Sequence, residues 1–296
     1  MQQREWEAPS LFNLCRKPRT CEYLEQAALA FPNIADSVGD IKAKTLFWML
    51  KRGIADYSAI APEILDAVSF AAPKLAVVTD NHGIARELSR LQYPIYFFDY
   101  ETYASPLPPF EGTKPYQNIP FQYSLSIKDA PTTSLRHTHY LATRFENPVR
   151  ELLGKLQGDI GPIGSIVVWF APFESRRNEE MAVMEPTFAK FLSELNERMF
   201  DLMLLFKPKN NLYLHSEFKG SASLKTVLPV LCPELSYDQL AIREGATAAA
   251  SWPLLTSGAL SDPEKKTLEH DMIAYCQRDT DAMAGILDHV LGIKVL

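Results

Sequence analysis

Two carboxylates lie in an otherwise apolar segment, residues 94–110, which reads PIYFFDYETYASPLPPF. The apolar run predicts a buried strand, and side chains two positions apart on a strand point to the same face. We therefore expect Asp99 and Glu101 to project together near the end of this strand. Adjacent negative charges in a buried strand require a partner, so the segment raises the question of what neutralises them.

Further carboxylates stand in other predicted elements. Glu174 follows the buried strand SIVVWF (residues 165–170), in the first turn of the next predicted helix. In the last predicted helix, Tyr275 and Asp279 are four residues apart and share a face. Each feature alone is also typical of a solvated strand end, a helix N-terminus or a half-exposed helical face. Together they predict three separated segments whose carboxylates converge.

Electrostatics dictates what such convergence needs. Two like charges about 4 Å apart repel by roughly 4 kcal/mol at an effective dielectric constant near 20. Either some carboxyl groups stay protonated or cations neutralise them. The hard cations Mg²⁺ and Mn²⁺ prefer oxygen ligands, and two such ions can clamp the attacking and leaving oxygens of a phosphodiester. The sequence thus indicates a two-metal site that acts on phosphate.

The elements around these residues predict an α/β fold with a mixed sheet flanked by helices. Residues 95–102, 120–129 and 133–142 read as three strands that pair antiparallel, and residues 165–170 read as a fourth strand that joins by a crossover. Helices are expected over residues 147–157, 172–206, 221–231 and 262–291.

The N-terminal region has a different texture. Residues 1–90 contain short amphipathic stretches at residues 21–31, 43–53 and 62–72 that predict helices. We therefore expect a helical accessory region over residues 1–90 and an α/β domain over residues 91–296. A helical module that binds a partner or nucleic acid is the alternative for residues 1–90, and its role stays open.

Composition limits the classes of function. The 296 residues are 47% hydrophobic, no apolar run approaches the roughly 20 residues that cross a bilayer, and residues 1–30 do not resemble a signal peptide. Four scattered cysteines are typical of a reduced, cytoplasmic chain. We expect no membrane partner, because no apolar run is long enough to span a bilayer. Because the formal net charge is −6, any binding of nucleic acid must depend on a few local Lys and Arg side chains or on metal ions.

The motifs together resemble a known superfamily. In chain order they read FFDYET, WFAPFESRRNEEMA and AYCQRDTDAM, which is similar to the DEDD, or DnaQ-like, 3′-5′ exonucleases with a ribonuclease H-like fold. The longer context, with FKGSASLKTVLP and LSYDQLAIREGATAA, more closely resembles a bacterial family known only as a domain of unknown function and grouped with those exonucleases. The resemblance covers roughly residues 94–292.

The resemblance implies a role for each motif residue. Asp99 would bridge two Mg²⁺ or Mn²⁺ ions, Glu101 and Asp279 would each ligate one, and Tyr275 would orient the attacking water as in the tyrosine subtype. The histidine subtype has His five residues before that aspartate, where this sequence has Ala274. The fourth carboxylate would be Glu174, where the superfamily usually has Asp, with Phe170 in place of the usual Asn. Asp201 is the second choice.

The implied activity is a two-metal-dependent 3′-5′ exonuclease that hydrolyses phosphodiester bonds at a single-stranded DNA or RNA end. The sequence does not decide between DNA and RNA. Cations and rings near the motifs are expected to bind the substrate: Lys114, Tyr116, Arg176, Lys219 and Lys225. Alternatively, the chain is a catalytically weak or inactive nuclease-fold module that binds nucleic acid or a protein partner, since fold does not guarantee activity.

Overall fold

The computed structural model describes residues 77–292 of the chain, which divides into two compact units. The first unit comprises residues 1–78 and 214–220, and the second comprises residues 79–213 and 221–296. The predicted helices at 21–31, 43–53 and 62–72 lie outside the described residues. Strands β1 (Val77–Thr79) and β7 (Tyr213–His215) form a two-stranded sheet. The proposed division at residue 90 stays a prediction.

A five-stranded mixed sheet forms the centre of the second unit. Its strand order is β4-β3-β2-β5-β6. The strands are β2 (Ile95–Tyr103), β3 (Ile119–Lys128), β4 (Arg136–Leu141), β5 (Ser165–Val168) and β6 (Met199–Asp201). Strands β2, β3 and β4 pair antiparallel, whereas β5 and β6 run parallel to β2. The predicted mixed sheet with an antiparallel meander and a crossover strand is confirmed.

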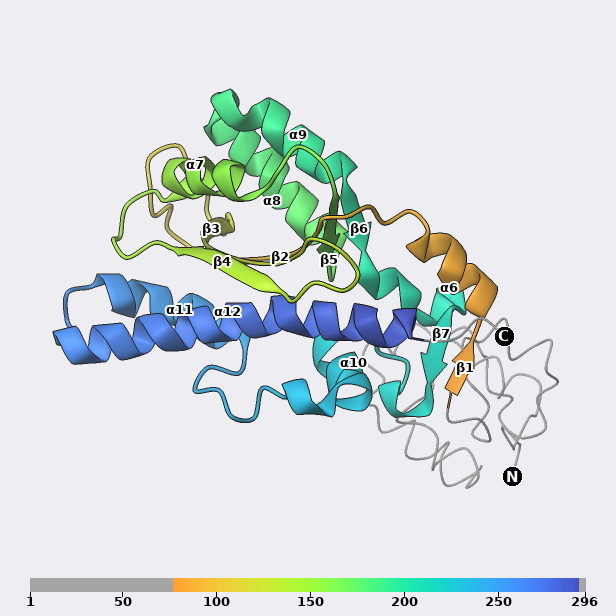
Figure 1. Ribbon diagram of the computed structural model, residues 1–296. Coiled ribbons are helices and arrows are strands. Elements are labelled where there is room, and N and C mark those ends of the chain that lie inside the picture. The colour runs from red at the N-terminus through yellow and green to blue at the C-terminus, as the bar shows by residue number, and fades with distance from the viewer. Residues whose placement is uncertain (1–76, 293–296) are drawn as a thin grey trace, which may run out of the picture. The chain divides into compact units, whose positions relative to one another are not determined.

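Helices cover both faces of this sheet (Figure 1). One face carries α7 (Val149–Asp159), α8 (Ala171–Met184) and α9 (Ala189–Glu197). The other face carries α12 (Asp262–Leu291), with α10 (Leu224–Leu231) and α11 (Gly245–Thr256) beside it. Every residue of β3 is buried, as expected for a strand with a helical layer on each side. Among the described residues no helix is both long and apolar enough to cross a bilayer.

Short elements complete the connections. Helix α6 (Asn81–Leu88) begins after Asp80, whose side chain accepts from the backbone N–H of Gly83. Five 3-10 turns lie within residues 77–292: η3 (Pro186–Phe188), η4 (Leu202–Leu205), η5 (Pro208–Asn210), η6 (Ser216–Phe218) and η7 (Pro233–Leu235). Helix α12 opens with a capping box formed by Ser261 and Glu264.

One prediction of secondary structure is wrong. Residues 172–206 do not form one helix but α8, η3, α9, β6 and η4 in succession. Pro186 is the cause of the first break, because the residue before a proline is pushed out of helical conformation, and Glu185 has φ −129° and ψ 77°. Strand β6 then pairs with β5, so tertiary pairing overrides the helical pattern of residues 199–201. Helix α11 was not anticipated.

A line of polar side chains on β3 fixes α12 against the sheet. Ser124 and Ser126 both hydrogen-bond to the Thr280 hydroxyl, at 2.8 and 3.0 Å. Lys128 donates to the Asp288 carboxylate at 2.6 Å, and the Gln122 amide donates to the Met272 carbonyl at 2.9 Å. We call these β3 residues, with their partners on α12, the polar seam. Because hydrogen bonds have fixed lengths and angles, the seam sets the register of α12 along β3.

The position of α11 depends on Trp252. Its indole is fully buried, stacks on Phe121 with ring centroids 5.0 Å apart, and donates to the Ala142 carbonyl at 2.8 Å. Replacing a buried Trp by Ala removes about 3–5 kcal/mol, so Trp252→Ala should lower the free energy of unfolding by that amount in urea titrations. Leu254→Ala, on the same helix at 47% exposure, should cost less than about 1 kcal/mol. Equal losses in the two variants would contradict this account.

Candidate metal centre

The alternation of side chains along β2 determines which of its residues enter the site. Asp99 and Glu101 pair with Ser124 and Gln122 of β3, so all four side chains share one face of the sheet. That is the face which the polar seam holds against α12. Glu101 is only 7% exposed, and the strand therefore directs both carboxylates into the space between β2 and α12.

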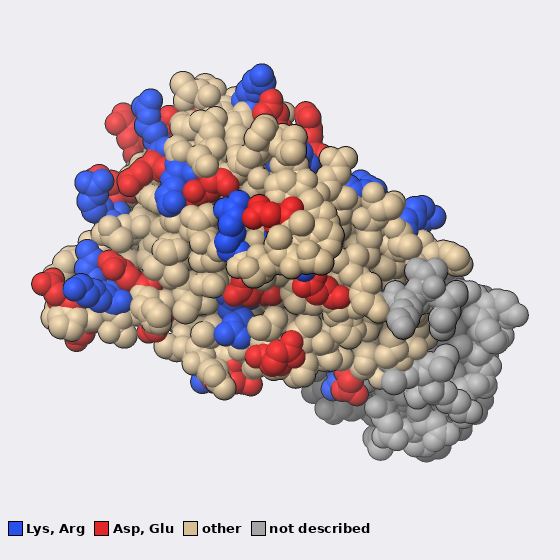
Figure 2. Space-filling model, viewed as in Figure 1, with Lys and Arg blue, Asp and Glu red and all other residues tan. Residues whose placement is uncertain are grey.

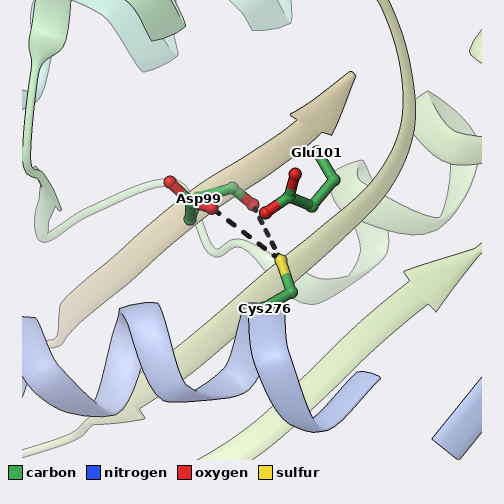
Figure 3. A group of neighbouring side chains, drawn as sticks. All are labelled: Asp99, Glu101 and Cys276. Carbon is green, nitrogen blue, oxygen red and sulfur yellow. Dashed lines mark hydrogen bonds between the residues drawn. The ribbon is translucent and has the colours of Figure 1, made fainter. Parts of the chain in front are cut away.

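Helix α12 supplies the opposite wall. Asp279 lies one residue before Thr280 of the polar seam, is 7% exposed and is close enough for its charge to raise the pKa of Asp99. Cys276 lies one turn earlier, and Figure 3 shows its thiol pointing toward Asp99 and Glu101. Ligand atoms of these three side chains, Asp99, Glu101 and Cys276, all lie within 4.8 Å of one another. Residues 177 positions apart in the chain thus meet.

Glu174 enters from the first turn of α8. Its side chain is 5% exposed, and one hydrogen bond comes from the backbone N–H of Tyr100. The other oxygen, Oε2, is buried without a hydrogen-bond partner among the described residues. Burial and the charge of Asp99 both raise the pKa of Glu174 well above its usual value. This oxygen is therefore a position at which a cation or a proton would satisfy the carboxyl group.

Burial raises the pKa of every carboxyl group of the cluster, and repulsion raises it further for Asp99, Glu101 and Glu174. Burial, then the charge of Asp279, raises the pKa of Asp99; burial, then Asp99, Asp279 and Glu174, raises the pKa of Glu101. Burial also raises the pKa of Asp279 to about 6. Four carboxylates that share one site are each harder to ionise than in water. A divalent cation would reverse that cost, since it attracts the ionised form.

The donor set favours a hard cation. Without a cation, burial and the four carboxylates raise the pKa of the Cys276 thiol well above its usual value. The other possible ligands are all carboxylate oxygens and outnumber this sulfur: Asp99, Glu101, Glu174 and Asp279. Oxygen donors suit Mg²⁺ and Mn²⁺, whereas thiolate-rich sites suit Zn²⁺. These residues therefore fit the ions that the sequence predicted.

Two tyrosines hold Asp279. The Tyr237 hydroxyl donates to Asp279 Oδ1, and the Tyr275 hydroxyl also hydrogen-bonds to this carboxylate. Burial, then the charge of Asp279, raises the pKa of both phenols far above the usual value, so both remain hydrogen-bond donors. Sequence reasoning identified Tyr275 but missed Tyr237. Tyr237 belongs to the segment LSYDQLAIREGATAA that carries part of the family resemblance, but neither that segment nor a fixed spacing indicated contact with Asp279.

Of the predicted substrate-binding residues, Lys225 lies at this centre. It comes from the first turn of α10, and its ammonium nitrogen is 5.7 Å from the ring centroid of Tyr237 and 5.8 Å from that of Tyr275. Its charge lowers the pKa of Glu101 and of Asp279. Lys225 also donates to the Arg243 carbonyl at 2.7 Å. The side chain thus offers a positive charge beside the carboxylates.

Three of the other predicted substrate-binding residues share a groove. Lys114, Tyr116 and Arg176 line one groove between residues 112–118 and α8. Lys219 belongs to the first unit, where it ends η6 in a left-handed conformation at φ 48°.

Asp201, the second choice for the fourth carboxylate, has other partners. It stands at the end of β6, accepts from the backbone N–H of Met203 at 3.2 Å, and pairs with Lys207 at 3.7 Å. Lys207 in turn lies 5.2 Å from the ring centroid of Phe170, the residue that precedes α8. Glu174 therefore has the position and the unpartnered oxygen that suit a ligand, whereas Asp201 has its own cation.

Comparison with known proteins agrees with part of the resemblance. Residues 96–223 match a family described as Domain of unknown function (DUF2779). Two curated relatives are the Uncharacterized protein MG366 of Mycoplasma genitalium, 23% identical over 206 residues, and the Uncharacterized protein MG366 homolog of Mycoplasma pneumoniae, 24% identical over 206 residues. Each alignment covers 64% of this chain and 31% of the relative, so the chain spans about a third of these longer proteins. No solved structure matches the chain significantly. The part of this chain from residue 96 to residue 223 is thus similar to a family whose function is not described.

Proposed function

We propose that this protein is a two-metal-dependent 3′-5′ exonuclease that hydrolyses phosphodiester bonds at a single-stranded nucleic-acid end. One observation carries the proposal: carboxylates from β2, α8 and α12 converge in one site, and one oxygen of Glu174 there has no hydrogen-bond partner within residues 77–292. The ribonuclease H-like motifs quoted above support the same reading, because they assign ligand roles to these residues in this chain order.

Each residue has a task in this proposal. Asp99, Glu101, Glu174 and Asp279 would hold two Mg²⁺ or Mn²⁺ ions, which when bound supply positive charge to the reacting phosphate oxygens. Tyr275 would orient the attacking water through its hydroxyl, which stays protonated. Tyr237 would keep Asp279 in one orientation. Lys225, on the exposed side of these rings, is available to a substrate phosphate.

A nuclease-fold module that binds nucleic acid or a protein partner without cleaving it is the second candidate. Glu174 in place of the usual aspartate favours it, since a longer side chain changes how a metal is held. The two candidates differ in what divalent ions and nucleic acid do to the protein.

Divalent ions should stabilise the fold. At a Mn²⁺ concentration about 100-fold above its dissociation constant, binding adds about 2.7 kcal/mol, which raises the melting temperature of a domain this size by about 5–10 °C. Asp99→Asn should melt no lower than the native protein in EDTA, because the amide removes a like charge from the cluster. The same variant should lose the gain from Mn²⁺, measured by differential scanning fluorimetry.

Matched variants identify the fourth ligand. Glu174→Gln should lose most of the Mn²⁺ gain, whereas Asp201→Asn should keep it because Asp201 pairs with Lys207. Cys276→Ala should keep the gain as well, since a hard cation prefers the carboxylate oxygens to sulfur. A gain from Mn²⁺ that survives in Asp99→Asn and Glu174→Gln would show that the ion binds elsewhere.

The activity itself is tested on end-labelled oligonucleotides. With Mg²⁺ or Mn²⁺ the protein should release nucleoside monophosphates from the 3′ end of single-stranded DNA or RNA, and EDTA should stop the reaction. Asp99→Ala and Asp279→Ala should lower the rate by at least about 100- to 1,000-fold, the loss expected when groups that stabilise transition-state charge are removed. A protein that binds Mn²⁺ but degrades neither polymer belongs to the second candidate.

The two tyrosines should differ in what they control. Tyr237→Phe should weaken Mn²⁺ binding about 10- to 100-fold, because a group that orients a metal ligand is lost. Tyr275→Phe should leave the Mn²⁺ melting shift in place and lower kcat by about 100-fold, as expected for a group that assists proton transfer or orients water. Tyr140→Phe is the control: Tyr140 is 8% exposed, like Tyr237, but stacks on Tyr123. Equal effects of all three substitutions would contradict the assignment.

A further inference from the structure

A groove separate from the carboxylates lies between residues 112–118 and α8. Its volume is about 720 Å³, within the range of ligand sites. The loop that connects β2 to β3 supplies one wall, and the first three turns of α8, with Phe170 before them, supply the other. We call this the loop–α8 groove. Nothing in the sequence alone brings these two segments together.

The loop–α8 groove is locally positive in an acidic protein. Its charged lining residues are Lys114, Arg176, Arg177 and Glu180. Both arginines pair with Glu180, at 3.1 Å and 2.9 Å, so one carboxylate balances one of the three cations. The side chain of Arg176 remains 71% exposed. On the face drawn in Figure 2, by contrast, Lys and Arg alternate with Asp and Glu without a broad positive area over the described residues.

Exposed rings stand beside these cations. Tyr116 is 70% exposed and Phe170 is 43% exposed. Tyr116 has φ 57°, a left-handed conformation that is rare for an aromatic residue and that concentrates at functional sites. Its backbone N–H donates to the Ser105 carbonyl at 2.7 Å, which holds the loop in this shape. The Tyr116 ring is thus held by a hydrogen-bonded loop and the Phe170 ring by the start of α8, and both are ordered enough for a base to stack on them.

The groove adjoins the carboxylate centre through two residues of its lining. Arg177 is 4% exposed, and its charge lowers the pKa of Glu174, three residues earlier on α8. Asn118 accepts from the Thr102 hydroxyl at 3.3 Å, and Thr102 follows Glu101 on β2. Because neighbouring side chains on a strand point to opposite faces of the sheet, Thr102 lies behind Glu101, and the groove reaches the carboxylate centre on the side of Glu174.

We propose that the loop–α8 groove binds the unpaired nucleotides of a nucleic-acid strand, with phosphates on Lys114 and Arg176 and bases stacked on Tyr116 and Phe170. This inference rests on the proposed function in taking nucleic acid as the substrate. Cations that follow the backbone and rings that stack on bases are the means by which proteins hold single strands. In a duplex the base faces are covered by their neighbours, so the same rings select unpaired strands.

Binding in EDTA tests the groove without cleavage. The probe is a fluorescein-labelled single-stranded DNA or RNA oligonucleotide, followed by fluorescence anisotropy with the full chain. Phe170→Ala and Tyr116→Ala should each weaken binding by about 5- to 100-fold, the loss expected of one base stack. Arg176→Ala should weaken binding and reduce the slope of log K against log salt by about one. A blunt duplex should bind at least about tenfold more weakly than the single strand.

Matched controls separate the groove from the general surface. Arg144 is 70% exposed on its side chain, like Arg176, and Phe145 is 44% exposed, like Phe170, and neither lines the groove. Arg144→Ala and Phe145→Ala should leave the dissociation constant unchanged. Circular dichroism and melting curves confirm that each variant folds, and Arg176→Glu, which reverses a surface charge, should weaken binding more than Arg176→Ala.

Each outcome decides for or against the groove. Groove variants that bind like the native protein, a duplex that binds as tightly as a single strand, or a native protein that binds neither polymer would overturn it. If the groove variants cleave with Mn²⁺ as fast as the native protein, the exonuclease proposal is supported and the groove proposal is refuted. Groove-dependent binding without cleavage under any divalent ion would support the groove and remove the exonuclease.

Discussion

Mutual repulsion among four carboxylates, three of them buried and Asp99 half-buried, is the constraint on which the rest of this structure depends. Asp99, Glu101, Glu174 and Asp279 come from three elements, and burial raises the pKa of each. A fold that gathers like charges loses stability unless other interactions hold the elements in place. The carboxylates therefore explain why the packing around them is more polar than a hydrophobic core needs to be.

The hydrogen bonds of the polar seam hold β3 and α12 together against that repulsion. Ser124, Ser126 and Thr280 are fully or almost fully buried, and they share hydrogen bonds at 2.8 and 3.0 Å between β3 and α12. Apolar residues at these positions would bury the same surface, but they would let α12 slide along the sheet, since hydrophobic contact has no direction. Hydrogen bonds in a buried network fix one arrangement. Asp279 precedes Thr280, so the seam also fixes the distance from Asp279 to β2.

The sequence predicted those parts of the site that depend on local geometry. A period of two places Asp99 and Glu101 on one face of a strand, and a spacing of four places Tyr275 and Asp279 on one face of a helix. The succession of strands β2 to β5 along the chain followed from apolar and alternating runs. The boundaries of α12 match residues 262–291 as expected. These features hold wherever the elements go in space, so a single chain can reveal them.

What the sequence did not predict depends on contacts between distant segments. Tyr237 meets Asp279 only because the turns after α10 lie against α12. Strand β6 exists because residues 199–201 add to the edge of β5. The loop–α8 groove needs residues 112–118 to lie beside a helix that starts more than fifty residues later. Periodicity and spacing within one segment do not predict contacts between distant segments. Where such contacts form, tertiary packing overrides local propensity.

Glu174 is the carboxylate that joins α8 to the cluster, and its surroundings explain how its side chain reaches the end of β2. Pairing between β2 and β5 ends at Phe97 and Val167, two residues before Asp99, so the two strands diverge before the site begins. Helix α8 starts on the far side of this opening. The Glu174 side chain reaches the end of β2, where the N–H of Tyr100 holds one oxygen, while the other has no hydrogen-bond partner in the part of the chain that the structure describes. Glu174 therefore brings a carboxylate from α8 close enough for the charge of Asp99 to act on it.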